Sequence, residues 1–358
     1  NLRTHRMLLA VLTHCTFLIL VPVNLWTTVT STTFITYLGT GVAVLRLELR
    51  TPAAVAQSSE LMSTLDQDPD VARVAPFLTA RFEVLNVDGE WEQLPVETGD
   101  HEVFPLSYLK GTSPGSPQEI SLSSLAADSM GVDVGEQIML RGETGARDVT
   151  LVGIYQDMTN GGRTAKGMVP VDGEPIVWRT VLVDAADGVA PAELAEQLSS
   201  SFPAVQTIEM SEFADQTLGD LIRQTGTVAT AAALIAVVLA ALIAAMFAQM
   251  VIARDQSQIA IQRGLGVSDR GLRLQYLTRF MVVLVAGVAL GTALVATVGR
   301  SMVASVIGSL GAPALRFDVD PLLAYVAVPL TLTATVAVVA LIATRSFDHL
   351  GVSQLNEE

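Results

Sequence analysis

The chain has 358 residues, of which half are hydrophobic, with a mean hydropathy of +0.48 and a formal net charge of −15. This is far more apolar surface than an ordinary soluble domain has to bury, so the composition indicates that part of the chain lies in a bilayer. The charge is unevenly divided: residues 42–221 hold 10 basic and 29 acidic residues, and the remainder holds 11 and 7. The acidic residues therefore belong to a soluble insert, and the basic ones flank the membrane.

Four uncharged runs are long enough to cross a bilayer, which takes about 20 helical residues. They cover residues 7–45, 224–253, 280–299 and 321–344, with only His14 inside the first. Core helices of a soluble protein would seldom be so long, and the first run is too long for a cleaved signal peptide. We predict transmembrane helices over 7–40, 211–253 (a stalk followed by the second span), 280–304 and 321–344.

Basic residues in the short connecting segments indicate the orientation. They lie in the N-terminal stub 1–6, in the loop 254–279 and in the tail 345–358. We therefore expect these three segments and both termini to be cytoplasmic, in the cell membrane. The insert 41–215 and the short loop 305–320 then lie outside. Because the chain begins at Asn1, we also expect further residues upstream.

The insert alternates helix and strand signals and is predicted to be an α+β domain. A helix is expected over 51–67, a hairpin around Asp88-Gly89, and a loop over 105–118. A strand and a helix ending at Gly131 follow, then a hairpin around residues 142–145, and a strand, helix and strand up to Met210. The β-rich middle, about 85–165, is predicted to be a second lobe.

Residues 211–254 contain no proline, and only Gly219 and Gly226 interrupt a helical pattern. At 1.5 Å per residue, one helix of this length measures about 66 Å, roughly twice the hydrocarbon thickness. Part of it would stand outside the membrane and connect the second span to the insert. A break at either glycine is the alternative.

Few residues carry a recognisable chemistry. The sequence has no Gly-Lys-Ser or Gly-Lys-Thr phosphate loop and no His-Glu-x-x-His motif, so no ATPase or catalytic activity is expected in this chain. Cys15 is the only cysteine, and His101 has no nucleophile elbow beside it. The spans carry no internal carboxylate or lysine, which argues against an ion-coupled carrier.

Two weaker candidate sites remain. Sulfur and phenol groups in or beside the spans could ligate haem iron, although such residues more often pack: Met246, Met250 and Tyr276. Residues 155–171 join a strand to a Gly-Gly turn and carry two cations. They form either a solvated loop or a contact site for substrate or partner, with Tyr155, Asn160, Arg163 and Lys166 as its candidates.

Residues 258–280 are the strongest candidate. They read as a short helix, a Gly-Leu-Gly-Val bend, Ser268 as an N-cap and a basic helix entering the third span. Exposed Ile259, Ile261 and Leu265 beside Arg263 suit docking into a groove of another protein, and a plain positive connector is the alternative. The predicted coupling residues are Gln258, Ile259, Ile261, Arg263, Gly264, Leu265, Gly266 and Val267.

The segment QIAIQRGLGVS (258–268) resembles the loop "EIAILRALGAS" of the FtsX-like, MacB-type permeases of ABC transporters, with Gln258 in place of the usual Glu. EISLSSLAADSMGVDVGEQIML (119–140) is also similar to a passage of that family's ectodomain. The resemblance covers nearly the whole chain, including the order of the spans and the position of the insert.

The resemblance implies a type VII ABC permease without a cofactor of its own. A cytosolic ABC ATPase dimer would bind ATP and Mg²⁺ and dock on the 258–267 loop. The other implied partners are a second permease copy or homologous half and membrane lipid, with no nucleic acid. The implied activity is ATP-driven export or extraction of a hydrophobic or amphipathic substrate such as a lipid, peptide antibiotic, lipoprotein or haem. The alternative is a mechanical signalling subunit that controls an envelope hydrolase or a sensor kinase.

Overall fold

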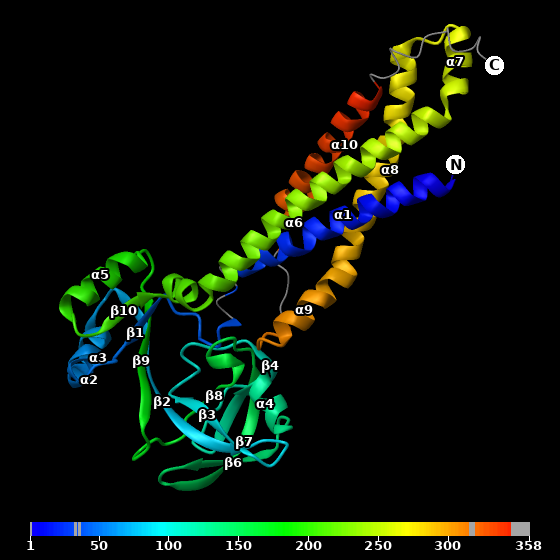
Figure 1. Cartoon of the computed structure of the whole chain (residues 1–358). Helices are drawn as coiled ribbons and strands as arrows, with labels where there is room; N and C mark the ends of the chain where they lie inside the picture. Colours follow the sequence, from blue (N-terminus) through cyan, green and yellow to red (C-terminus); the bar gives the residue numbers. More distant parts are fainter. Residues whose placement is uncertain (1, 32–33, 35–36, 315–318, 345–358) are drawn as a thin grey trace. The chain divides into compact units, whose positions relative to one another are not determined.

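The computed structural model describes residues 2–31, 34, 37–314 and 319–344, and these residues form two compact units. The first, here called the membrane unit, comprises residues 1–30, 221–303 and 317–358. The second, here called the inserted domain, comprises residues 31–220 together with residues 304–316. Figure 1 gives the order of their helices and strands. The predicted tail 345–358 lies outside the described residues.

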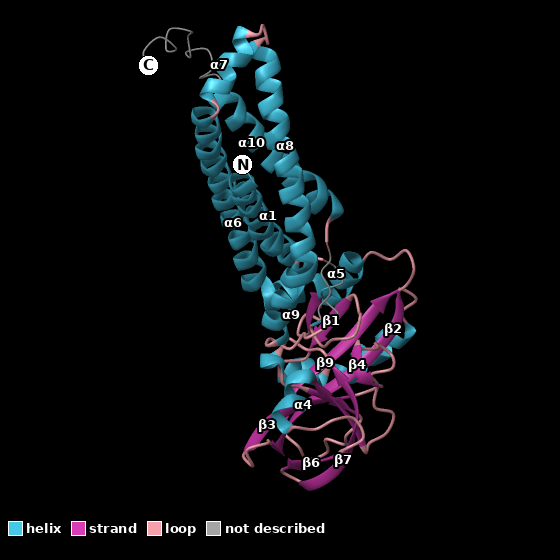
Figure 2. Cartoon of the chain, turned by 90° about the vertical axis from the view of Figure 1, so that its right-hand side faces the viewer, coloured by secondary structure: helices cyan, strands magenta, loops and turns pink. Residues whose placement is uncertain are grey.

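Among the described residues, four helices are long and apolar enough to cross a membrane, which agrees with the predicted number: Arg6–Val29, Met210–Arg254, Arg270–Gly308 and Leu323–Ala343. They belong to α1 (Leu2–Val29), to α6 (Met210–Arg254), to α8 (Asp269–Leu294) with η3 (Val295–Gly299) and α9 (Arg300–Gly308), and to η4 (Leu323–Ala327) with α10 (Val328–Thr344). Figure 2 shows the helices of the membrane unit running alongside one another.

Two predicted span boundaries are wrong. The first helix ends at Val29 rather than at residue 40. Residues 27–33 are all β-branched or serine, residue types with low helix propensity, and this run favours a helix end. The third helix continues to Gly308 rather than ending at 304, since the residues after Arg300 are mostly apolar and include no proline. In contrast, α6 is one helix of 45 residues, as predicted, without a break at Gly219 or Gly226.

The membrane unit is held together by close packing of α1 on α8. A Cβ added at Gly287 would lie 2.8 Å from Leu12 Cβ, and one at Gly291 would lie 2.5 Å from Thr16 Cβ. Small residues allow helix backbones to approach in this way in membranes. The α6 helix contributes a row of small buried residues to the same core: Ala229, Ala236, Ala240, Ala244 and Ala248.

The inserted domain is built on a ten-stranded sheet with the order β10-β1-β9-β2-β3-β8-β5-β7-β4, and β6 pairs with β2 and β7. The strands are β1 (Leu45–Glu48), β2 (Val71–Leu85), β3 (Trp91–Thr98), β4 (Tyr108–Gly111), β5 (Glu119–Ser123), β6 (Gln137–Gly142), β7 (Gly145–Tyr155), β8 (Ala165–Gly167), β9 (Ile176–Ala185) and β10 (Gln206–Glu209). Its helices are α2 (Pro52–Ala56), α3 (Ser58–Gln67), α4 (Ser124–Met130) and α5 (Pro191–Ser201).

Two hydrophobic clusters divide this domain into lobes, in line with the predicted β-rich middle. One cluster contains Phe82, Ile120 and Leu151, and the other contains Leu47, Leu61 and Leu198. The long strands β2 and β9 pair antiparallel and contribute to both lobes. This pairing makes the two lobes parts of one sheet.

The hairpin at Gly89 and the helix end at Gly131 form as predicted, with φ of +79° and +66°. Other predictions need correction. The expected loop 105–118 contains β4, which pairs with β7, and the short strands β1 and β8 were not predicted. The helix expected over 51–67 is divided at Gln57 into α2 and α3. These short strands owe their conformation to distant partners rather than to their own sequence.

Replacing Gly291 by Val should destabilise the membrane unit, because the added atoms meet the Thr13 carbonyl oxygen and the Thr16 side chain. Overpacking of this kind costs about 1–3 kcal/mol. Thermal unfolding of the detergent-solubilised chain should have a lower midpoint. Gly271→Ala on the same helix is the control, since its Cβ would make only ordinary contacts. Equal midpoints for the two variants would contradict the packing.

Candidate functional site

The candidate coupling segment is a short helix followed by a sharp turn. The α6 helix ends at Arg254, and α7 covers Gln256–Gly264. At its end the Val267 N–H donates to the Gln262 carbonyl at 3.0 Å, and Gly266 has φ of +89°. This is a Schellman-type helix end, which requires a left-handed residue. Ser268 then caps α8, its hydroxyl accepting from the Gly271 N–H at 3.3 Å. The predicted helix, bend and N-cap are thus confirmed.

Three apolar side chains of this segment face outward. Leu265 is 79% exposed, Ile261 63% and Val267 42%. Gln258, Gly264 and Gly266 are also exposed, whereas the Arg263 side chain lies outside the described part of the structure. An exposed Ile259 was wrongly predicted: its side chain is 2% exposed and belongs to the same buried cluster as Leu272. Ile259 therefore anchors α7, and its outer surface is formed by Ile261 together with Leu265 in the turn that directly follows the helix.

The base of the segment is fixed by contacts between α6 and α8. The rings of Phe247 and Phe280 pack edge to face, with their centroids 5.4 Å apart. The Arg279 guanidinium lies 4.0 Å from the buried carboxylate of Asp255, the residue between α6 and α7. Phe247 and Phe280 belong to the same buried cluster as Ile259, so α7 packs against this base.

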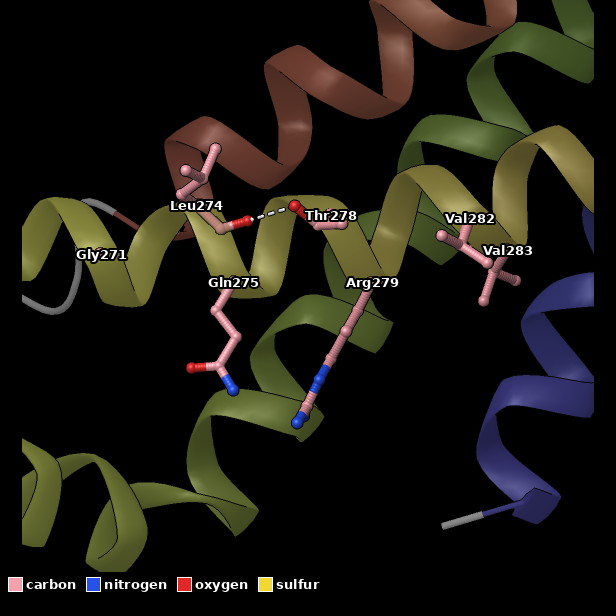
Figure 3. Close-up of a pocket in the computed structure, with 7 residues that line it drawn as sticks. All are labelled: Gly271, Leu274, Gln275, Thr278, Arg279, Val282 and Val283. Carbon is pink, nitrogen blue, oxygen red and sulfur yellow. Dashed lines mark hydrogen bonds between the residues drawn. The ribbon is translucent and has the colours of Figure 1, made fainter.

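An open groove of about 770 Å³ lies along α8 next to this base (Figure 3). Its lining mixes polar and apolar residues, all from α8: Gly271, Leu274, Gln275, Thr278, Arg279, Val282 and Val283. The Thr278 hydroxyl donates a hydrogen bond to the Leu274 carbonyl at 2.8 Å. Arg279 belongs both to this wall and to the contact with Asp255.

The four predicted contact residues of the inserted domain do not form one surface. Asn160 and Lys166 line a cavity of about 230 Å³, and the buried Tyr155 hydroxyl lies 2.8 Å from the Thr164 hydroxyl in its wall. Arg163 instead pairs with Glu92 at 3.1 Å. Asn160 has φ of +49°, an uncommon conformation for a residue other than glycine.

Most of the charged groups around this smaller cavity were not predicted from the sequence. Lys166 pairs with Glu97 at 2.5 Å, and Arg46 pairs with Glu48 at 2.8 Å. Arg46 also stacks on Phe213, with its guanidinium 4.7 Å from the ring centroid. Arg46 and Glu48 share β1, whereas Glu97 and Lys166 come from β3 and β8, so no local motif could reveal the whole cluster. Because each of these cations pairs with an anion of the cluster, the buried charges compensate one another.

Burial dominates the electrostatics of the cluster. It raises the pKa of the Asp157 carboxyl, although Lys166 and the hydroxyl donors oppose the shift. Asp157 accepts from the Thr159 N–H at 2.7 Å and from the Thr159 hydroxyl at 2.6 Å. Burial, helped by the charge of Lys166, lowers the pKa of His101 to about 4. The His101 ring stacks on Phe77 with centroids 4.8 Å apart, a structural role.

The candidate haem ligands do not form a pair of opposed ligands. Met246 and Met250 lie one turn apart on α6 and are 70% and 46% exposed. Because both sulfurs project from the same helix face, they cannot bind iron from opposite sides. The side chain of Tyr276 lies outside the described part of the structure.

Comparison with known proteins gives two family matches. The model of the MacB-like periplasmic core domain matches residues 25–201, and that of the FtsX-like permease C-terminal region matches residues 230–348. None of the curated proteins compared with the chain matches it.

Solved structures similar to the chain include the following two. The periplasmic region of MacB from Actinobacillus actinomycetemcomitans is 13% identical, with a TM-score of 0.37, covering 53% of this chain and 97% of its own. The extracellular domain of the noncanonic ABC-type transporter YknZ from Gram-positive bacteria is 13% identical, with a TM-score of 0.32, covering 47% and 100%.

Four apolar helices with an α+β domain between the first two define a multi-pass protein of the cell membrane. The two family matches follow each other along the chain and together cover most of it. The chain belongs to the FtsX-like, MacB-type permeases of ABC transporters. Its inserted domain is the extracytoplasmic domain of that fold, and members of the family work with a cytosolic ABC ATPase.

The low pKa of His101 predicts a pH-dependent stability. The neutral ring is favoured in the folded state, so its stabilising effect is complete above about pH 6.5 and is lost as the pH falls towards 4. The loss amounts to about 3 kcal/mol at most. Asp157, whose pKa is raised, acts in the opposite sense.

His101→Phe keeps the stacking on Phe77 and removes the titrating group. The unfolding midpoint of the full chain in detergent, followed by tryptophan fluorescence, should therefore fall less between pH 7 and pH 5 in this variant than in the unmodified chain. His14→Phe, which changes an exposed histidine in α1, is the matched control. The interpretation fails if His101→Phe and His14→Phe have the same pH dependence.

Proposed function

We propose that this chain is the permease subunit of an ABC transporter that takes its energy from a separate cytosolic ATPase dimer docked on α7. The observation that carries the proposal is the apolar outer surface of α7, with Leu265 79% and Ile261 63% exposed. Neighbouring apolar side chains that project from a connector into the cytosol are stabilised by burial in a partner's groove. ATP and Mg²⁺ would bind to the partner, and both termini of this chain would be cytoplasmic.

Transmission through α6 is supported by its continuity. One helix extends from Met210, at the end of β10, to Arg254, next to α7. An unbroken helix is stiff along its axis, so displacement at α7 would reach the extracytoplasmic domain. The Phe247–Phe280 and Asp255–Arg279 contacts would make α8 move with it.

The proposed substrate is hydrophobic or amphipathic, such as a lipid, peptide antibiotic, lipoprotein or haem, and it is exported or extracted from the membrane. Large apolar side chains on an exposed face of α6 support this class: Leu234, Ile235, Val238, Leu242 and Met246. That face would contact membrane lipid, substrate or a second permease copy or half.

Docking can be tested by placing charges on the outer surface of α7. Ile261→Asp with Leu265→Asp should weaken co-purification of the ATPase subunit by at least about tenfold, because apolar contacts at the centre of an interface carry most of its binding energy. Val87→Asp is the matched control, since this exposed side chain lies in the inserted domain. Full retention of the ATPase by the double variant would refute docking on α7.

Transmission can be tested by interrupting α6. A Pro-Gly insertion after Gly219 breaks the helix and should abolish most ATP-linked activity while the ATPase remains bound. The same insertion after Gly89 is the control. It should have little effect, because Gly89 lies in an open hairpin turn, where a Cβ built on it would have no neighbour within 4 Å. Unchanged ATP-linked activity in the Gly219 insertion would exclude a rigid α6.

A further inference from the structure

The segment between the third and fourth spans belongs to the extracytoplasmic domain. Residues 304–316 are part of the inserted domain's compact unit, although more than 80 residues of chain separate them from its main part at residues 31–220. Short loops between spans commonly lie free over the membrane surface. A loop that instead folds with the domain connects that domain directly to α9, in addition to α1 and α6.

Three hydrogen bonds attach this loop to one place on the domain. The Gly311 carbonyl accepts from the Asp157 N–H at 3.1 Å and from the Ser124 hydroxyl at 3.4 Å. The Ala314 N–H donates to the Gln156 side-chain oxygen at 2.8 Å. Gly311, Asp157, Ser124 and Gln156 are all buried. Opening this contact would leave buried polar groups without partners, which is costly.

The backbone at Gly311 admits no side chain. Its φ is +105°, and an added Cβ would lie 1.9 Å from the Asp157 carbonyl oxygen. The same glycine follows α9, and the next residue, Ala312, donates its N–H to the Ile307 carbonyl at 3.2 Å. The contact between Gly311 and Asp157 is therefore made by the capped end of α9 and not by a flexible loop.

The opposite side of the same domain segment holds the chain that leaves α1. Leu38 forms a bridge with Asp157, and the Met158 N–H donates to the Tyr37 carbonyl at 3.1 Å. A Cβ on Gly39 would lie 2.2 Å from the Asp157 carboxyl carbon. Residues 156–162 are thus held between the chain after α1 and the chain after α9. These three segments, 37–39, 156–162 and 310–314, are here called the junction.

We propose that the junction stays closed throughout the working cycle and is a second mechanical connection, by which the extracytoplasmic domain moves together with α9 and the chain after α1. Asp157 is its central positioning residue. Its backbone N–H holds the loop after α9, and its carboxylate is fixed by Thr159 and Thr164. The coupling to ATP rests on the proposed function, whereas the closed contact does not.

Hydrogen–deuterium exchange of the full chain in nanodiscs with its ATPase partner tests the junction. The Asp157 amide should exchange slowly in the resting complex and equally slowly during ATP turnover. Gly311→Ala, which cannot fit, should make its exchange about tenfold faster, as expected for one lost buried hydrogen bond. The matched control is Gly308→Ala, whose Cβ would make contacts of 3.4 Å or more.

Gln156→Leu is a second, milder variant that removes only the bond to the Ala314 N–H and serves if Gly311→Ala does not fold. Either variant should lower ATP-linked activity severalfold while the ATPase stays bound. Fast exchange at Asp157 during turnover of the unmodified chain would show that the junction opens, and unchanged activity in a variant that exchanges fast would show that it transmits nothing. Both results would overturn the proposal. Release of the ATPase is read separately and concerns docking alone.

Discussion

The structure depends on the close contact between α1 and α8. In a bilayer, helices gain little from burying apolar side chains against one another, so their association relies on tight packing of small residues. Gly287 and Gly291 allow α8 to approach Leu12 and Thr16 on α1 within van der Waals distance. The α8 helix in turn carries the contacts to α6 through Phe280 and Arg279. The position of α7 follows from this arrangement.

Because the membrane unit fixes α7 in this way, the two sides of that helix have different roles. Ile259 is buried in the membrane unit and Leu265 is exposed, although they are only six residues apart. The buried side chain holds α7 in place, and the exposed ones remain available to a partner. Because α6 begins where the sheet of the extracytoplasmic domain ends and finishes next to α7, a force on α7 has a direct path along the chain. The junction at Asp157 adds a second path through α9.

Much of this architecture was predictable from the sequence, because strong local signals specify it. Uninterrupted apolar runs gave the number of spans, and Ser268 and Gly131 marked a helix start and a helix end that the structure confirms. The 258–268 motif and the 119–140 passage gave the family. The predicted end of the first span was wrong because hydropathy does not register that residues 27–33 are all β-branched or serine, types with low helix propensity.

Features that rest on distant contacts were not predictable. The charged cluster assembles Arg46, Glu97 and Lys166 from three strands, and β8 forms only because β3 and β5 lie on either side of it. The burial of Ile259 likewise depends on the fold of the whole membrane unit, since its own segment reads as an exposed amphipathic helix. In the same way, nothing near Gly311 in the sequence indicates that it must contact Asp157.

The central claim, that the ATPase docks on the outer surface of α7, is tested most directly by photocrosslinking from single positions of this helix. A photoreactive amino acid at Leu265 should crosslink to the ATPase subunit in intact membranes. The same group at Ile259, on the buried side, should crosslink only within this chain. Crosslinking of Leu265 to lipid or to a second permease copy, without any ATPase product, would contradict the account.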